Sequence, residues 1–236
     1  MLKISRSKID LFIECPRCFY LDVKRKIKRP LGYPFNLNNA VDILLKKEFD
    51  KHRANCTKHP LQIEFGIDSL PAQHPMLEKW RESIKHGVIF HDTEKDLHIY
   101  GGIDDLWINS KGEYHVVDYK ATAKDKPVTE LAEWTSGYKR QLEVYQWLLR
   151  KNGLKVSNTA YFVYCTGDNT VESFDNKIIF HSHIIAYEGN DSWINQTIEN
   201  LHYCLQHEKT PNKSYSCEYC NFFSKLYSEL VNDKKK

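Results

Sequence analysis

The sequence predicts an α/β fold in which helices flank a central mixed β-sheet. Three observations predict this class. Apolar residues recur at helical spacing in four segments, short β-rich segments separated by turn residues lie between residues 87 and 120, and an apolar strand follows at 159–165. The 236 residues suffice for one large domain with a sizeable core, and we see neither an internal repeat nor a clean linker. We therefore expect a single domain over residues 1–236.

Four long helices are expected along the chain. Ser5 or Ser7 would cap the first, which ends near Cys15. Gly153 follows the third helix at the position where a C-terminal cap is expected. The predicted ranges are 5–15, 38–53, 137–152 and 191–207.

The strands are expected in two groups. Three short segments form an antiparallel meander, in which residues 109–112 (Asn-Ser-Lys-Gly) make a tight hairpin connection. Two further strands follow the third of these helices. The predicted ranges are 87–91, 97–107 and 113–120 for the meander, and 159–165 and 178–187 for the later pair.

The stretch between the second helix and the meander has little periodicity. Residues 55–75 hold three prolines and are expected to be mostly irregular. Pro75 is then expected to open a short helix that runs to about Lys85, because proline is well tolerated at the first position of a helix.

Composition excludes several classes of protein. With 28% charged and 41% hydrophobic residues, the chain is neither collagen-like nor disordered, and no apolar run is long enough to span a membrane. The N-terminus carries no secretory signal pattern, so we expect a cytoplasmic location. The net charge of +3 is too small to indicate a nucleic-acid partner by itself. The basic run at 24–29 is either solvated surface or a phosphate contact.

Two aspartates and a lysine form the most informative pattern. Asp118 and Lys120 are two residues apart on a predicted strand and therefore project to the same face, and the preceding hairpin strand can bring Asp104 beside them. Converging carboxylates suit Mg²⁺ or Mn²⁺, and an adjacent lysine can orient water or stabilise charge on a phosphate. These residues are the expected catalytic set. The alternative is an ordinary surface ion pair.

This arrangement of G-x-I-D and V-V-D-Y-K resembles the PD-(D/E)XK nuclease superfamily, in its RecB-like exonuclease branch. That branch includes CRISPR-associated RecB-like nucleases and the nuclease domain of AddB. The resemblance covers nearly the whole chain and implies a restriction-endonuclease-like core. It implies metal-dependent hydrolysis of DNA phosphodiesters by an exonuclease-like enzyme of repair, recombination or processing. No Walker A motif is present, so a helicase motor would have to be supplied by a partner.

The resemblance extends to two helices. Gln141 and Tyr145 look like the branch's Q-x-x-x-Y motif, which implies that they line the active site or contact DNA; the alternative is a core tyrosine and a solvated glutamine. Relatives usually place a metal-binding histidine on an early helix, and Asp42 stands at that position here. Asp42 is therefore expected as a third metal ligand. The alternative is a surface acid, with water as the ligand.

Seven cysteines are an odd number, and without a secretion signal they favour metal binding over disulfides. Two C-x₂-C pairs, Cys15 with Cys18 and Cys217 with Cys220, supply four thiolates. The resemblance implies a four-iron four-sulfur cluster, although no third cysteine follows Cys220, so Cys18 would replace it. Zn²⁺ accepts the same four ligands and is the alternative metal. A third alternative is that the four cysteines are ordinary reduced thiols without a metal.

Two rivals to a deoxyribonuclease remain. The first is a catalytically inactive module that binds DNA or a protein partner on the same fold. The second is an RNA-acting enzyme, since nothing in the sequence reads a 2′-hydroxyl. The presence of both aspartates and the lysine favours the active enzyme.

Overall fold

The computed structural model describes residues 1–32, 36–82, 86–132 and 135–233, and the chain divides into two compact units. Unit 1 comprises Met1–Lys3 and Pro34–Asp191, and unit 2 comprises Ile4–Tyr33 and Ser192–Lys236. The expectation of one domain over the whole chain stays a prediction. No helix among the described residues is long and apolar enough to cross a membrane.

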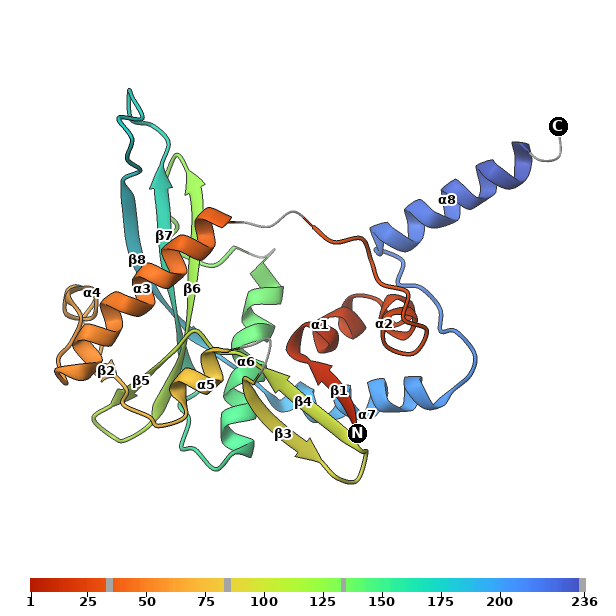
Figure 1. Cartoon of the computed structure of the whole chain (residues 1–236), viewed down its shortest axis with the longest axis horizontal. Coiled ribbons are helices and arrows are strands. Elements are labelled where there is room, and N and C mark those ends of the chain that lie inside the picture. The colour runs from red at the N-terminus through yellow and green to blue at the C-terminus, as the bar shows by residue number, and fades with distance from the viewer. Residues whose placement is uncertain (33–35, 83–85, 133–134, 234–236) are drawn as a thin grey trace. The chain divides into compact units, whose positions relative to one another are not determined.

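Unit 1 is built on a curled five-stranded sheet (Figure 1). Neighbouring strands are antiparallel except the central pair, β6 and β7, which are parallel, so the predicted mixed sheet is confirmed. In sheet order the strands are β2 (Ser69–Pro71), β5 (Asp105–Asn109), β6 (Tyr114–Lys124), β7 (Thr159–Asp168) and β8 (Phe180–Glu188).

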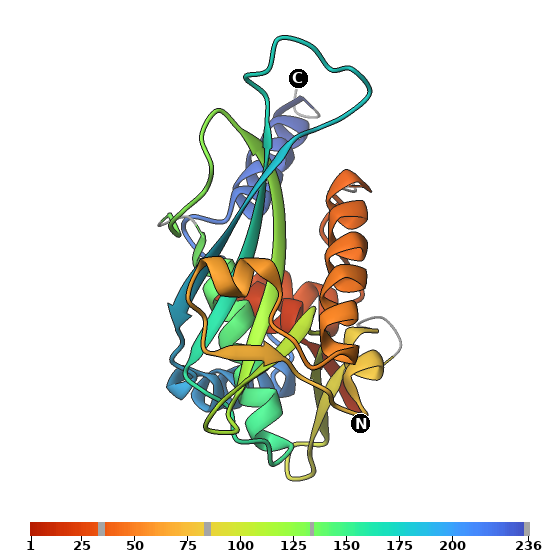
Figure 2. The same cartoon turned by 90° about the vertical axis from the view of Figure 1, so that its left-hand side faces the viewer.

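Two long helices cover opposite faces of this sheet (Figure 2). Helix α3 (Asn36–Ala54) places Leu45 and Phe49 on one face, and α6 (Ser136–Lys151) crosses the other. A parallel pair of strands needs such a crossover, and α6 provides it between β6 and β7. Both helices lie within two residues of their predicted ranges. Gly153 has a φ of +82°, which confirms the expected left-handed cap after α6.

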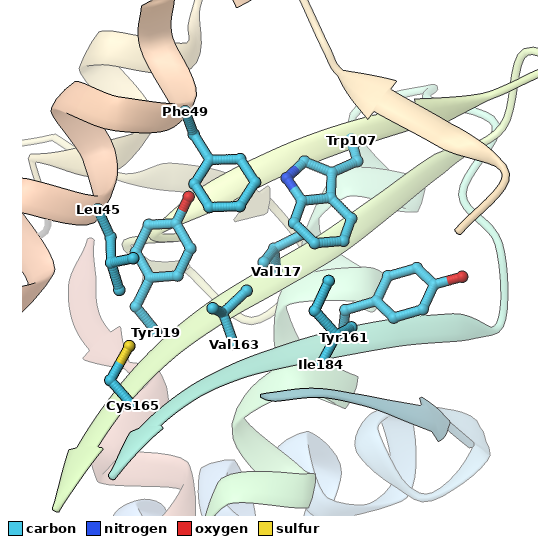
Figure 3. Close-up of a cluster of buried hydrophobic side chains, with 9 residues drawn as sticks. All are labelled: Leu45, Phe49, Trp107, Val117, Tyr119, Tyr161, Val163, Cys165 and Ile184. Carbon is cyan, nitrogen blue, oxygen red and sulfur yellow. The ribbon is translucent and has the colours of Figure 1, made fainter. Parts of the chain in front are cut away.

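Alternate side chains of β6 point into the apolar core under α3 (Figure 3). Val117 and Tyr119 point into an apolar cluster with Phe49 and Trp107, whose rings stack with centroids 5.4 Å apart. Because strand side chains alternate between faces, the even-numbered neighbours of these residues must point to the α6 face. The side chains in this cluster are Leu45, Phe49, Trp107, Val117, Tyr119, Tyr161, Val163, Cys165 and Ile184.

The expected meander is wrong in one respect, because the predicted strand 97–107 is interrupted. Strand β4 (Leu97–Gly101) belongs to a separate three-stranded sheet with the order β1-β4-β3, and β5 begins only at Asp105. The other two strands of that sheet are β1 (Leu2–Ser5) and β3 (Val88–Asp92). Between β4 and β5, the Ile103 N–H donates to the Trp80 carbonyl and the Asp104 carbonyl accepts from Arg81 Nε. These contacts replace the ladder and turn the chain at Asp104.

Those partners come from α5 (Leu77–Arg81), which is shorter than the helix expected from Pro75 to Lys85. Residues 83–85 lie outside the described residues. The stretch expected to be irregular also contains α4 (Pro60–Glu64) and β2. Helix α4 is capped by His59, whose side chain accepts from the Leu61 N–H. Elements of three to five residues are too short to show a hydrophobic period, so the sequence does not predict them.

Unit 2 consists mainly of helices. Helices α1 (Arg6–Glu14) and α7 (Ser192–Gln206) match their predictions, whereas α2 (Pro16–Val23) and α8 (Glu218–Asp233) were not expected. In the basic run, Lys24 Nζ donates to the carbonyls of Leu205 and His207 at the end of α7, at 3.0 and 2.6 Å. A cation is favourable at a helix C-terminus, so at least this lysine of the run has a structural contact.

Candidate active site and cysteine cluster

A polar cleft of about 500 Å³ opens in unit 1 beside β6. Asp104 and Asp118 line it together with Lys120, so the structure brings the predicted catalytic set to one place. Asp42 and Gln141 also line the cleft. Tyr145 is buried behind it and hydrogen-bonds to Gln141. Five of the six residues expected in this site therefore face one cavity, and the sixth supports it.

Strand β6 presents Asp118 and Lys120 on the face opposite the apolar cluster, as the period of two predicts. Their charged groups are in contact, through Asp118 Oδ2 and Lys120 Nζ. This is not a surface pair, because the side chains are 0% and 16% exposed. The ammonium also lies 4.7 Å from the centroid of the Tyr138 ring, a cation–π contact that fixes its direction.

Asp104 is held at the turn between the two sheets. The β5–β6 register begins with the pair of Asp105 and Val117, and Asp104 directly precedes this pair. Asp104 Oδ2 accepts the N–H of Tyr119 at 3.0 Å. The carbonyl of the same aspartate accepts from Arg81. Both its backbone and its carboxylate are therefore fixed beside Asp118.

The site concentrates negative charge in a buried place. Burial raises the pKa of Asp118 to about 7, the nearby Asp104 carboxylate raises it as well, and the charge of Lys120 opposes both. Burial by itself lowers the pKa of Lys120, but the charges of Asp118 and Asp104 outweigh it, so that pKa is raised. Lys120 thus stays charged and only partly compensates two carboxylates.

A second lysine, which the sequence analysis missed, sits between the remaining acids. Lys46 Nζ donates to Asp42 Oδ2 at 2.8 Å and lies 3.4 Å from Asp104 Oδ1. Burial raises the pKa of Asp42, and the charge of Asp104 adds to this effect. The i, i+4 spacing of Asp42 and Lys46 on a predicted helix was the available signal. Asp42 thus reaches the cleft with a lysine bound to it.

Gln141 connects α6 to the buried carboxylate. Its Nε2 donates to Asp118 Oδ1 at 2.9 Å and to the Tyr145 hydroxyl at 3.1 Å. The expected sharing of one helix face by Gln141 and Tyr145 is confirmed. A hydrogen bond to the ionised form favours that form, so Gln141 helps to keep Asp118 an acceptor.

Behind the cleft lies a buried ion-pair network that the sequence analysis also missed. Asp105 is fully buried and accepts from Arg81 Nη2 at 3.0 Å, from the Tyr119 hydroxyl at 2.7 Å and from Arg53 Nη2. Asp50 binds both arginines from the other side. The network's two arginines and two aspartates balance in charge. The available signal was Arg53, which continues the apolar stripe of α3 four residues after Phe49.

The acids suit a hard divalent cation. Asp104 and Asp118 provide carboxylate oxygens, the donor type that Mg²⁺ and Mn²⁺ prefer, and the raised pKa of Asp118 reflects a cost that a bound cation would offset. The residues present therefore fit such an ion, and Asp42 is near enough to line the same cleft.

The four predicted cysteines come together in unit 2. Their sulfur atoms all lie within 4.8 Å of one another, and the four side chains are buried. Burial acts to raise the pKa of Cys15, but hydrogen bonds from the backbone of Ser214 and Cys18 outweigh it and lower that pKa to about 6. Arg29 Nη2 donates to Cys217 Sγ at 3.6 Å. Clustered thiols with a donor of positive charge fit a metal centre.

Comparisons with known proteins add a family. The sequence model of the PD-(D/E)XK nuclease superfamily matches residues 39–224. A search of curated proteins finds no match. Among solved structures, the chain is similar to one titled "Crystal structure of SSO0001", with 17% sequence identity and a TM-score of 0.37, over 94% of this chain and 84% of that one.

Proposed function

The chain belongs to the PD-(D/E)XK nuclease superfamily, and from this premise we propose that it is a divalent-metal-dependent deoxyribonuclease. The observation that carries the proposal is the convergence of Asp104, Asp118 and Lys120 on one polar cleft. Nuclease activity is typical of the superfamily, and the fold of unit 1 is consistent with its restriction-endonuclease-like core.

Each residue of the predicted site has a proposed task. Asp104 and Asp118 would hold Mg²⁺ or Mn²⁺, and Asp42 would be a further ligand once its carboxylate turns from Lys46. An ion held there would supply an activated water and would neutralise charge on the phosphate. Lys120 positions the attacking water and stabilises the charge that develops on the phosphate. Gln141 holds the Asp118 carboxylate in place, and Tyr145 supports Gln141.

We propose an exonuclease-like activity in DNA repair, recombination or processing, from the resemblance of Gln141 and Tyr145 to the RecB-like motif. A helicase or recombination partner would supply the DNA end. The four cysteines of unit 2 would hold a metal that supports one nuclease module over residues 1–236. A reducing compartment such as the cytoplasm would keep these thiols available for the metal.

We expect cleavage of DNA to depend on a divalent cation. End-labelled single-stranded and double-stranded DNA, and a matched RNA, are each incubated with the full chain and Mg²⁺, Mn²⁺ or EDTA. Shortened DNA products should form with Mn²⁺ or Mg²⁺ and disappear with EDTA, because the clustered carboxylates need a cation to bind the phosphate.

The same assay separates the rivals. DNA that is bound but uncut with every metal would favour the inactive binding module. Preferential cutting of RNA would replace the proposed substrate. Products that shorten stepwise from a labelled end indicate an exonuclease, whereas internal fragments indicate an endonuclease.

Replacing Gln141 by leucine should lower the rate of cleavage about 10- to 100-fold, since a hydrogen bond to a charged group is worth ~1.5–3 kcal/mol. The variant removes the donor to Asp118 Oδ1 and leaves both acids and Lys120 in place. Gln196, exposed on α7, provides the matched control, and Gln196→Leu should cut at the wild-type rate. Equal cleavage rates for the two variants would refute the proposed role of Gln141.

A further inference from the structure

The sulfur atoms of the cysteine cluster lie closer together than an iron–sulfur cluster allows. Cys18 Sγ is 3.5 Å from Cys220 Sγ and 3.6 Å from Cys217 Sγ, and Cys15 Sγ is 3.8 Å from Cys220 Sγ. The full set fits within 4.8 Å. These distances test whether a four-iron four-sulfur cluster or a single Zn²⁺ fits this chain.

A single tetrahedral ion accounts for the distances. With Zn–S bonds of about 2.3 Å, tetrahedral geometry puts neighbouring sulfurs roughly 3.8 Å apart. In a four-iron cluster each thiolate binds a different iron, which puts the sulfurs roughly 6 Å apart. The three separations of 3.5, 3.6 and 3.8 Å are near the first value. A cluster would require all four side chains to move outward.

The local chain is built for the same geometry. In each pair the first cysteine stands immediately before a helix and the second lies in its first turn: Cys15 and Cys18 at α2, and Cys217 and Cys220 at α8. Pro16 occupies the first position of α2, where its fixed φ suits the helix. Two C-x₂-C pairs of this kind provide a closed four-cysteine site of the structural zinc type. The N-terminal ends of both helices favour the negative charge of the thiolates.

Arg29 completes the surroundings. One Zn²⁺ and four thiolates carry a net charge of −2, and Arg29 brings a positive charge to Cys217 Sγ. Its guanidinium lies 4.6 Å from the centroid of the Tyr219 ring, and its Nη1 donates to Glu14 at 2.7 Å. These contacts aim the arginine at the sulfurs, as outer-shell partners of metal sites do.

We infer that unit 2 holds one Zn²⁺ on Cys15, Cys18, Cys217 and Cys220, in place of the iron–sulfur cluster that the family resemblance implies. With four protein ligands the site has no open position, so its role is structural: it joins the start of α2 to the start of α8 within unit 2. The inference rests on the proposal that these cysteines bind a metal and does not depend on nuclease activity.

The test measures metal content on the full wild-type chain. The protein is purified anaerobically from cells supplied with both iron and zinc, and zinc, iron and acid-labile sulfide are counted per chain. A second portion is stripped of metal and offered Zn²⁺, or Fe²⁺ with sulfide, under the same conditions. We expect about one zinc per chain, no stoichiometric sulfide and a colourless protein as purified. The stripped chain should take up about one Zn²⁺ and should form no iron–sulfur cluster.

Variants locate the ion. Cys18→Ser and Cys217→Ser should each lose the zinc and melt at a lower temperature, because the site contributes to folding. Cys204→Ser changes a half-buried cysteine of the same unit and should keep one zinc. If a serine variant does not fold, the metal count of the wild-type chain still decides the question.

Two results would overturn the inference. Iron and sulfide at about four per chain, with broad absorption near ~400 nm, would mean a cluster and would leave the broader metal proposal standing. A chain that holds neither zinc nor iron at stoichiometric level would end both. Neither result bears on cleavage at the cleft of unit 1.

Discussion

The Lys120→Ala variant should cut DNA at least about 100-fold more slowly than the wild-type chain, the loss typical of removing one group that stabilises developing charge. Lys120 is the cation in contact with Asp118, and it is nearly buried at the cleft. Alanine removes the charge that would face the phosphate. It also leaves the Asp118 carboxylate buried without its counter-ion, so the pKa of that group should rise further and its hold on a metal should weaken.

Controls distinguish lost chemistry from lost structure. Lys126→Ala changes an exposed lysine just beyond the end of the same strand and should cleave as the wild-type chain does. Asp118→Asn, which keeps the size of the side chain and removes its charge, should show a loss as large as Lys120→Ala. Circular dichroism melting of each variant checks that it is folded. A folded Lys120→Ala variant with wild-type turnover would refute the assignment of this cleft.

The meeting of Asp104, Asp118 and Lys120 at one cleft could be predicted because its geometry is local. The period of two along β6 places Asp118 and Lys120 on one face, and a tight hairpin brings Asp104 beside them. The same reasoning places Gln141 and Tyr145 on one helix face. These inferences need only strand and helix geometry, so they hold even though the strand containing Asp104 was predicted too long.

The rest depends on contacts between distant residues. The strand is interrupted before Asp105 because Ile103 and Asp104 form hydrogen bonds with Trp80 and Arg81. No pattern within residues 97–107 predicts these hydrogen bonds. The network around Asp105 likewise joins α3, α5 and two strands, so its members look like unrelated charges in the sequence. The cysteine pairs at α2 and α8 predicted metal binding, but the helices that carry them were not predicted.

That network makes Asp105 a residue whose loss should cost much of the chain's stability. Asp105→Asn keeps the shape of the side chain but removes its negative charge. Arg53 and Arg81 then carry one buried positive charge that no carboxylate of the network balances. Breaking a buried ion pair in this way costs ~3–5 kcal/mol. For a chain of this size we expect the melting temperature to fall by at least about 6 °C. Asp125→Asn, at an exposed aspartate, should leave the melting temperature unchanged.

A milder variant keeps the test decisive if Asp105→Asn does not fold. Tyr119→Phe removes only the hydroxyl that donates to Asp105 Oδ2 at 2.7 Å, and should cost about 1.5–3 kcal/mol. The Tyr119 N–H still binds Asp104, so folded Tyr119→Phe should retain cleavage while it melts earlier. If both variants instead had the melting temperature of the wild-type chain, the Asp105 network would contribute nothing to stability. The turn that carries Asp104 would then depend on contacts outside that network, the Ile103 N–H bond to the Trp80 carbonyl and the Tyr119 N–H bond to the Asp104 carboxylate.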